Sequence, residues 1–202
     1  MVTDNLNQMP ETIRITLQVT GLLEKLGTPY LIGGSVASIV HGETRLTNDL
    51  DLVADLSENQ IAAMVEALEA EFYVDNQAIQ RAIRERSSFN LIHLATMFKV
   101  DVFIHRRDEW AREQMRRSVS KSLLEGDDST MRQVSSAETM ILQKLLWFRK
   151  GGEVSDRQWR DVLGMLKVQA ERLDFDYLRQ WAVALQISDL LEKSLQESGK
   201  RQ

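Results

Sequence analysis

Three aspartates lie inside two short apolar segments in which hydrophobic and polar residues alternate. Asp49 and Asp51 lie on either side of Leu50 at the start of the segment 50–54, and Asp101 belongs to residues 99–104. Side chains two positions apart on a strand project from the same face, so Asp49 and Asp51 place two carboxylates close together. Like charges at that spacing repel, and a divalent cation neutralises them through its preference for hard oxygen ligands. The alternative for an isolated Asp-x-Asp pair is the solvated face of an edge strand.

Asp101 adds a third carboxylate, because residues 99–104 are predicted to form a strand close to the first acidic one. Three carboxylates on neighbouring strands can hold two Mg²⁺ ions about 3.5–4 Å apart. In such a site one ion activates an attacking hydroxyl and the other bridges nucleotide phosphates. The acidic residues therefore indicate phosphoryl or nucleotidyl chemistry.

A second chemical feature is the pair of glycines that follows the short apolar segment 30–32. Gly33 and Gly34 allow the backbone to approach a ligand closely, and Ser35 begins a predicted short helix with free N–H groups at its start. This combination can bind phosphate, although two glycines before a helix also form ordinary tight turns. The glycine spacing matches neither a Walker loop nor a dinucleotide-binding fingerprint.

Taken together, Gly33-Gly34-Ser35, Asp49-Leu50-Asp51 and Val100-Asp101-Val102 resemble the nucleotidyltransferase superfamily typified by polymerase beta. Within it, the sequence is similar to the AbiEii-like bacterial nucleotidyltransferases, whose pattern adds a Lys-x-Asp strand and a downstream lysine and aspartate. Lys99-Val100-Asp101, Lys144 and Asp161 match these additions. The last acidic element departs from the pattern, because Gly164 occupies its second acidic position.

The resemblance implies a role for each matching residue. Ser35 and the Gly33–Gly34 backbone would bind the triphosphate, and Asp49 and Asp51 would bind both metal ions. Asp101 would hold the catalytic metal and help to deprotonate the acceptor hydroxyl.

Three further residues are predicted to contact the nucleotide. Lys144 would neutralise phosphate charge, Asp161 would supply the last acidic element, and Arg45 would reach phosphates from the loop before the acidic strand. Each residue also has a plainer interpretation. Lys144 would be a solvated lysine on an amphipathic helix, and Asp161 would pair with Arg157 one helical turn away. Arg45 would be an ordinary loop residue.

The activity implied by the resemblance is transfer of a nucleoside monophosphate from an NTP, such as ATP or GTP, to a hydroxyl acceptor. It would require Mg²⁺, with two ions bound and Mn²⁺ as a substitute. The acceptor would be RNA, particularly a tRNA end, in a toxin–antitoxin setting with an antitoxin partner. Two alternatives stay open: a nucleotide-binding module without catalysis, and nucleotidyl transfer to an aminoglycoside-like small molecule.

The elements that must position these residues form an α/β amino-terminal part, residues 1–134, and a helical carboxyl-terminal part, residues 135–202, that is expected to pack on it. The resemblance, which spans about residues 29–166, implies a small mixed sheet flanked by helices, in an α/β or α+β arrangement. Strands are predicted at 30–32, 50–54, 89–94, 99–104, 118–124 and 131–134, the third and fourth as a hairpin. Helices are predicted at 11–26, 35–41, 57–68, 76–86, 106–117, 135–150, 156–169, 175–185 and 188–197.

Composition fits this interpretation. The 202 residues are 43% hydrophobic and 27% charged, and contain no cysteine, which excludes disulfides, thiolate nucleophiles and cysteine-ligated metals. Residues 1–104 carry seven Lys/Arg against fourteen Asp/Glu, whereas residues 105–202 carry eighteen against sixteen. An acidic metal-binding half and a mildly basic phosphate-facing half would explain this split.

No apolar run is long enough to span a bilayer, so we expect a soluble cytoplasmic protein without a membrane partner.

Overall fold

The computed structural model describes residues 9–42 and 47–199. Within them the chain divides into two compact units, the first from residues 9–36 and 47–134 and the second from residues 37–42 and 135–199. One boundary between the units lies at residues 134/135, and a second lies between residues 36 and 37, so that residues 37–42 belong to the second unit.

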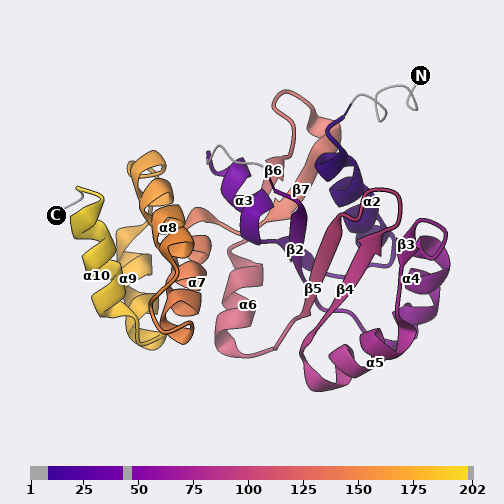
Figure 1. Ribbon diagram of the computed structural model, residues 1–202. Helices are drawn as coiled ribbons and strands as arrows, with labels where there is room; N and C mark the ends of the chain where they lie inside the picture. The colour runs from indigo at the N-terminus through magenta and orange to yellow at the C-terminus, as the bar shows by residue number, and fades with distance from the viewer. Residues whose placement is uncertain (1–8, 43–46, 200–202) are drawn as a thin grey trace. The chain divides into compact units, whose positions relative to one another are not determined.

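A seven-stranded mixed sheet forms the centre of the first unit, with strand order β3-β4-β5-β2-β1-β7-β6 (Figure 1). β2 and β5 pair in parallel, as do β1 and β7, whereas the other neighbours are antiparallel. The strands are β1 (Tyr30–Ile32), β2 (Asp49–Ala54), β3 (Phe72–Tyr73), β4 (Ser88–His93), β5 (Lys99–Ile104), β6 (Val119–Ser122) and β7 (Met131–Val134). This architecture confirms the predicted mixed sheet flanked by helices.

The alternation in β2 and β5 divides their side chains between a buried face and a half-exposed face. Leu50, Leu52 and Ala54 of β2 are fully buried, and Val100 and Val102 of β5 are buried beside them. The intervening positions, which include all three aspartates, keep partial contact with solvent. Burial of the apolar face therefore fixes the register that brings the acidic positions onto the other face.

Helices of the first unit cover the sheet and connect its strands. α2 packs against β2, and α5 packs against β4 and β5, with α4 against α5. Short 3₁₀ turns occupy Glu58–Gln60 and Asp128–Thr130. The helices are α2 (Glu11–Lys25), α4 (Ile61–Leu68), α5 (Asn76–Glu85) and α6 (Glu109–Arg116), with α3 (Gly34–Val40) crossing the division between the units.

The second unit contains the helices α7 (Ala137–Lys150), α8 (Asp156–Val168), α9 (Phe175–Ala184) and α10 (Ser188–Glu197). The helix predicted to begin at residue 135 begins at Ala137, because Ser136 is its N-cap and accepts a hydrogen bond from the Thr139 N–H. Glu138, in the first turn of α7, accepts a hydrogen bond from the backbone N–H of Asp174 at 3.1 Å. This carboxylate therefore links the start of α7 to the N-cap of α9.

Most predicted elements are found within a few residues of their expected limits, and the β4–β5 hairpin is confirmed. The helix predicted at 106–117 begins only at Glu109, where Asp108 supplies the N-cap. The two-residue strand β3 at the sheet edge was not predicted, because two residues are too few to show alternation. No helix in the described part of the chain combines the length and the apolar character needed to cross a membrane.

Tyr30 of β1 donates a hydrogen bond to Glu24 Oε1 of α2 at 2.6 Å. Burial, followed by this bond and the charge of Glu24, raises the pKa of Tyr30 well above its usual range.

Above about pH 10 an unfolded tyrosine releases its proton while the folded one keeps it, so the free energy of unfolding should fall as pH rises. We expect Tyr30→Phe to cost about 1 kcal/mol at pH 7 and to flatten this alkaline slope. Urea titrations between pH 7 and 11 would measure both effects.

Tyr73→Phe provides the matched control for this prediction, because the Tyr73 side chain is exposed on β3. Its alkaline slope should equal that of the wild type. An unchanged slope in Tyr30→Phe would contradict the assignment.

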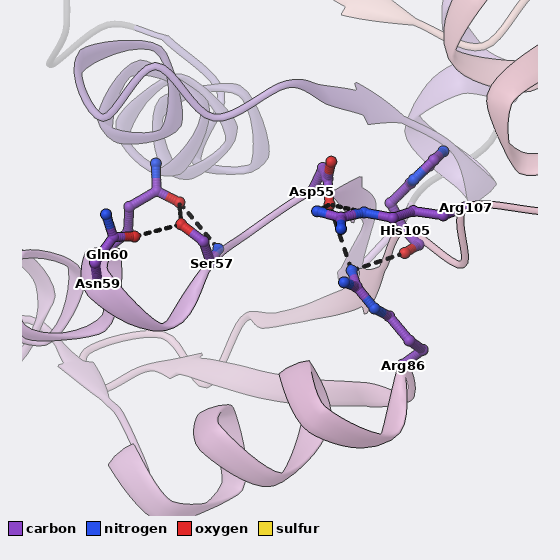
Figure 2. A network of polar contacts seen from close by, with 7 residues as sticks. All are labelled: Asp55, Ser57, Asn59, Gln60, Arg86, His105 and Arg107. Carbon is purple, nitrogen blue, oxygen red and sulfur yellow. Dashed lines mark hydrogen bonds and ion pairs between the residues drawn. The ribbon is translucent and has the colours of Figure 1, made fainter.

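Asp55, the residue after β2, holds together three chain segments at the carboxyl ends of β2 and β5 (Figure 2). Its Oδ1 atom accepts hydrogen bonds from Arg107 Nη2 at 2.9 Å and from Arg86 Nη1 at 3.4 Å. Arg86 Nη1 also donates to the His105 carbonyl at 3.2 Å. The same figure shows Ser57, Asn59 and Gln60 closing the turn that leads into α4. Asp55 thus links the end of α5 to the segment after β5.

We expect Asp55→Ala to lower the free energy of unfolding by about 1 kcal/mol, because two partly exposed arginines lose their shared acceptor. Asp55→Asn keeps the accepting oxygen and should lose about half as much. Chemical denaturation at low and high salt would separate the charge contribution, which salt screens, from the hydrogen bonds. A loss from Asp55→Asn as large as that from Asp55→Ala would show that charge alone matters.

Candidate active site

Asp51 and Asp101 are direct neighbours in the parallel pairing of β2 with β5. Adjacent strands lie about 4.8 Å apart, and both side chains belong to the half-exposed face, so their carboxylates share one patch of surface. Asp49 is paired with Lys99 in the same register. The structure therefore brings the three predicted aspartates onto one face of two adjacent strands and adds a lysine.

Gly34 lies directly against the carboxylate of Asp51. A Cβ atom built on Gly34 would stand 1.7 Å from Asp51 Oδ2 and 2.6 Å from its Cγ. Gly34 also has a φ of +55°, a left-handed conformation that favours glycine. In addition, the Gly33 N–H donates to the Asp51 carbonyl at 2.9 Å. Gly34 is thus required by the approach of the turn to Asp51, whereas Gly33 contributes a backbone hydrogen bond that does not itself need a glycine.

Ser35 follows this turn and is buried, with 6% of its surface exposed. The predicted helix begins at Gly34, one residue before Ser35, and contains seven residues. Its position beside the Asp51 contact is consistent with the predicted phosphate-binding turn. That binding role remains a prediction.

Two donors converge on one oxygen of Asp101. Lys99 Nζ lies 2.8 Å from Asp101 Oδ1. With the Asn90 amide oriented so that its NH₂ group faces Asp101, its nitrogen donates to the same Oδ1 at 3.0 Å. Asn90 is the cross-strand partner of Asp101 in the β4–β5 hairpin. Asn90 was not among the predicted site residues, because only the hairpin register places it opposite Asp101.

Asp49, Asp51 and Asp101 together form what we call the acidic face. Lys99 interacts electrostatically with all three of these residues. Its hydrogen bond to Asp101, and then the charges of Asp101, Asp51 and Asp49, raise the pKa of Lys99 above its ordinary value. Lys99 matched the Lys-x-Asp pattern in the sequence, but the pattern gave it no role.

Asp49 is held by Thr47, which lies two residues before it in the chain. Thr47 Oγ1 donates to Asp49 Oδ1 at 2.6 Å, and the backbone N–H of Asp49 approaches the same hydroxyl at 3.4 Å. This contact fixes one carboxylate oxygen at the start of the strand. Arg45, predicted to reach phosphates from the same loop, lies outside the described residues.

The donor set fits a hard divalent cation in chemical type, since carboxylate oxygens on a half-exposed face are the ligands that Mg²⁺ takes. Within residues 9–42 and 47–199, however, no three acidic or histidine side chains are gathered closely enough to enclose a metal ion. Thr47 and Lys99 bind oxygens of Asp49 and Asp101 respectively. The carboxylates are therefore placed side by side, without forming a closed metal cluster.

Lys144 and Asp161 meet in the helical unit. Lys144 Nζ of α7 lies 2.6 Å from Asp161 Oδ2 of α8, and the two side chains are only 14% and 13% exposed. The lysine is therefore largely buried, unlike the solvated residue considered as an alternative. The sequence predicted that both residues belong to the site but not that they bind each other.

Comparison with known proteins supports the fold. The antibiotic-resistance factor ANT(2'')-Ia in solution superposes with a TM-score of 0.55 at 12% identity, covering 92% of this chain and 97% of that one. The crystal structure of ANT(2'')-Ia in complex with adenylyl-2''-tobramycin gives a TM-score of 0.54 at 11% identity, covering 88% and 98% of the two chains. An antigenic nucleotidyltransferase-like protein from Paracoccidioides brasiliensis gives 0.53 at 15% identity, covering 91% and 92%.

No protein-family profile and no curated protein matches the sequence. The structural similarities establish that this chain shares a fold with nucleotidyltransferase structures. They do not extend to the AbiEii-like subfamily.

Proposed function

We propose that this protein is a divalent-metal-dependent nucleotidyltransferase, which transfers a nucleoside monophosphate from an NTP to a hydroxyl acceptor. The observation that carries the proposal is the in-register pair Asp51 and Asp101, placed beside the Gly34 turn. Its occurrence in a fold shared with nucleotidyltransferase structures supports the reaction type.

In the proposed reaction, the acceptor oxygen forms a bond to the α-phosphorus while the bond from that phosphorus to the β-phosphate oxygen breaks. Pyrophosphate leaves, and Asp101 takes the proton of the acceptor hydroxyl. Asp49, Asp51 and Asp101 would hold Mg²⁺ or Mn²⁺, which supplies charge neutralisation and orients the phosphates. The backbone of Gly33 and Gly34, with the Ser35 hydroxyl, would bind phosphate oxygens.

The proposed nucleotide-binding roles of Lys144 and Asp161 rest on the sequence resemblance, and that of Arg45 rests on its place in the loop before the acidic strand. Within the helical unit, the Lys144–Asp161 ion pair orients the ammonium group and partly neutralises it. Loss of NTP affinity in Lys144→Met, with the helical unit still folded, would support its role.

Two acceptor classes deserve a direct test. RNA, particularly a tRNA end, follows from the sequence resemblance, and would place the protein in a toxin–antitoxin pair with an antitoxin partner in the cytoplasm. A small polyhydroxyl acceptor is favoured by one structural observation: ANT(2'')-Ia, which has this fold, was solved with adenylyl-2''-tobramycin. The chemistry at the α-phosphorus is the same for both.

The test is incubation of the full chain with each α-labelled NTP and Mg²⁺, in separate reactions containing total RNA, purified tRNA, or tobramycin. Label transferred to an acceptor, together with pyrophosphate release that chelation abolishes, is the expected result. Transfer to tobramycin alone would exclude the RNA acceptor, and transfer to RNA alone would exclude the aminoglycoside. Binding of Mg-NTP without pyrophosphate release in any reaction would favour the inactive nucleotide-binding module and overturn the proposed activity.

A further inference from the structure

Lys99 occupies a distinctive place in the acidic face. It begins β5, its register partner in β2 is Asp49, and its ammonium group lies 2.8 Å from Asp101 Oδ1. Its backbone N–H also approaches the Asn48 carbonyl, the residue before β2, at 3.4 Å. The backbone of Lys99 is therefore fixed beside the acidic residues of both strands.

The ammonium group is suited to the place that a metal ion would take. It is a compact cation with three donors, and it bonds the carboxylate that the proposed reaction needs. The other donor to the same oxygen, the Asn90 amide, carries no charge. Lys99 is thus a cation that balances part of the charge of the acidic face in the described structure.

The Lys99–Asp101 ion pair is also easily opened. The Lys99 side chain is 46% exposed, against 19% for Asp101. Ion pairs with that exposure contribute little to stability, so the ammonium can leave the carboxylate at small cost. The Lys99 ammonium group therefore competes with other cations for the carboxylates of the acidic face.

We propose that Lys99 is a built-in counter-cation, a positioning residue that neutralises Asp49, Asp51 and Asp101 in the metal-free protein and lowers their affinity for a divalent cation. This inference rests on the proposed function, because it takes these carboxylates as the metal ligands. It goes further in giving Lys99 a role that opposes metal binding. Its consequence is that the acidic face stays folded without metal and binds metal reversibly.

The test is Mn²⁺ binding to the metal-free full chain, followed by electron paramagnetic resonance without nucleotide. Lys99→Met keeps the length of the side chain and removes the charge. We expect it to bind Mn²⁺ about tenfold more tightly, the effect of removing one unit charge a few ångströms from a divalent ion in a solvated site. Lys99→Arg keeps the charge and should bind within about threefold of the wild type.

Lys121→Met is the matched control for net charge. Lys121 lies on the edge strand β6, separated from β5 by β2, β1 and β7. At a spacing of about 4.8 Å per strand it is beyond the screening length of about 8–10 Å, so its loss should leave Mn²⁺ affinity unchanged.

Thermal unfolding with and without Mn²⁺ provides a second measurement. In Lys99→Met the carboxylates repel without compensation, so the metal-free Tm should fall and Mn²⁺ should restore it. A Tm loss that Mn²⁺ does not repair would indicate a merely structural lysine and would overturn the inference.

The outcomes separate the two proposals. Wild-type binding that Lys99→Met leaves unchanged or weakens would overturn the role of Lys99 while keeping the proposed metal site. Mn²⁺ binding to Lys99→Met but not to the wild type would support the inference, with the Lys99 ammonium competing even more strongly with the metal ion. Absence of Mn²⁺ binding in all variants would overturn the inference on Lys99, whereas the transfer assay with α-labelled NTP and Mg²⁺ decides the proposed activity independently.

Discussion

Asp51→Asn is expected to reduce nucleotidyl transfer at least about 10³-fold, which corresponds to about 4 kcal/mol of transition-state stabilisation. The substitution keeps the shape of the side chain but removes the charge that would bind the metal ions, whose charge stabilisation is worth several kcal/mol. Asp101→Asn should lose as much, because the neutral amide can neither bind the cation well nor accept the acceptor proton. Transfer of α-labelled nucleotide, measured at saturating Mg²⁺, would quantify both losses.

Glu66→Gln serves as the control, because it removes one negative charge from an exposed position of α4. It should retain wild-type transfer. Circular dichroism and denaturation would show that the Asp variants remain folded; we expect them to be no less stable than the wild type, because a like-charge repulsion is relieved. Full activity in folded Asp51→Asn would exclude Asp51 from the reaction.

Gly34→Ala is expected to lower the free energy of unfolding by about 2–4 kcal/mol. About 1 kcal/mol of this arises from the left-handed conformation, with φ +55°. The rest arises from overpacking, because the new methyl group would stand 1.7 Å from Asp51 Oδ2 and must displace it. Urea denaturation would measure the loss, and transfer should fall with it because the carboxylate moves.

Two comparisons separate the contributions. Gly126→Ala carries a similar conformational cost, with φ +80°, but its Cβ would meet nothing within 4 Å, so it should lose only about 1 kcal/mol. In an Asp51→Ala background the contacts with Oδ2 and Cγ are removed and only the contact with the Cβ of residue 51, at 2.8 Å, is left, so Gly34→Ala should cost less than in the wild type. A cost of Gly34→Ala that is equal in both backgrounds would show that Asp51 does not require the glycine.

Much of the fold could be predicted because its signals are local. Alternation around residues 50–54 and 99–104 predicted both central strands, and burial of Leu50, Leu52, Val100 and Val102 explains why. The error at the start of α7 has a local cause as well: Ser135 and Ser136 are adjacent and either could cap the helix, but Ser136 accepts the hydrogen bond from the Thr139 N–H.

The candidate site was predictable in its residue types but not in its contacts. The contact between Asn90 and Asp101 depends on the register of the β4–β5 hairpin, because this register places the two residues opposite each other. The sequence alone does not fix that register. Gly34 approaches Asp51 so closely that no Cβ atom fits between them. This approach depends on the folded backbone and cannot be read from the spacing of the two residues in the sequence. Likewise, the Lys144–Asp161 pair requires two helices to be packed before either residue can find the other.

The parallel pairing of β2 with β5 has a consequence for how the protein acquires its function during folding. Asp51 and Asp101 are adjacent in the sheet, yet the chain between them contains α4, β3, α5 and β4. Closing so long a loop is entropically costly, and parallel pairing between distant segments forms slowly. The acidic face therefore cannot exist in a partly synthesised chain that ends before β5. A nascent chain would be inert until its central strands have joined, however well its first glycine turn and Asp-Leu-Asp segment are formed.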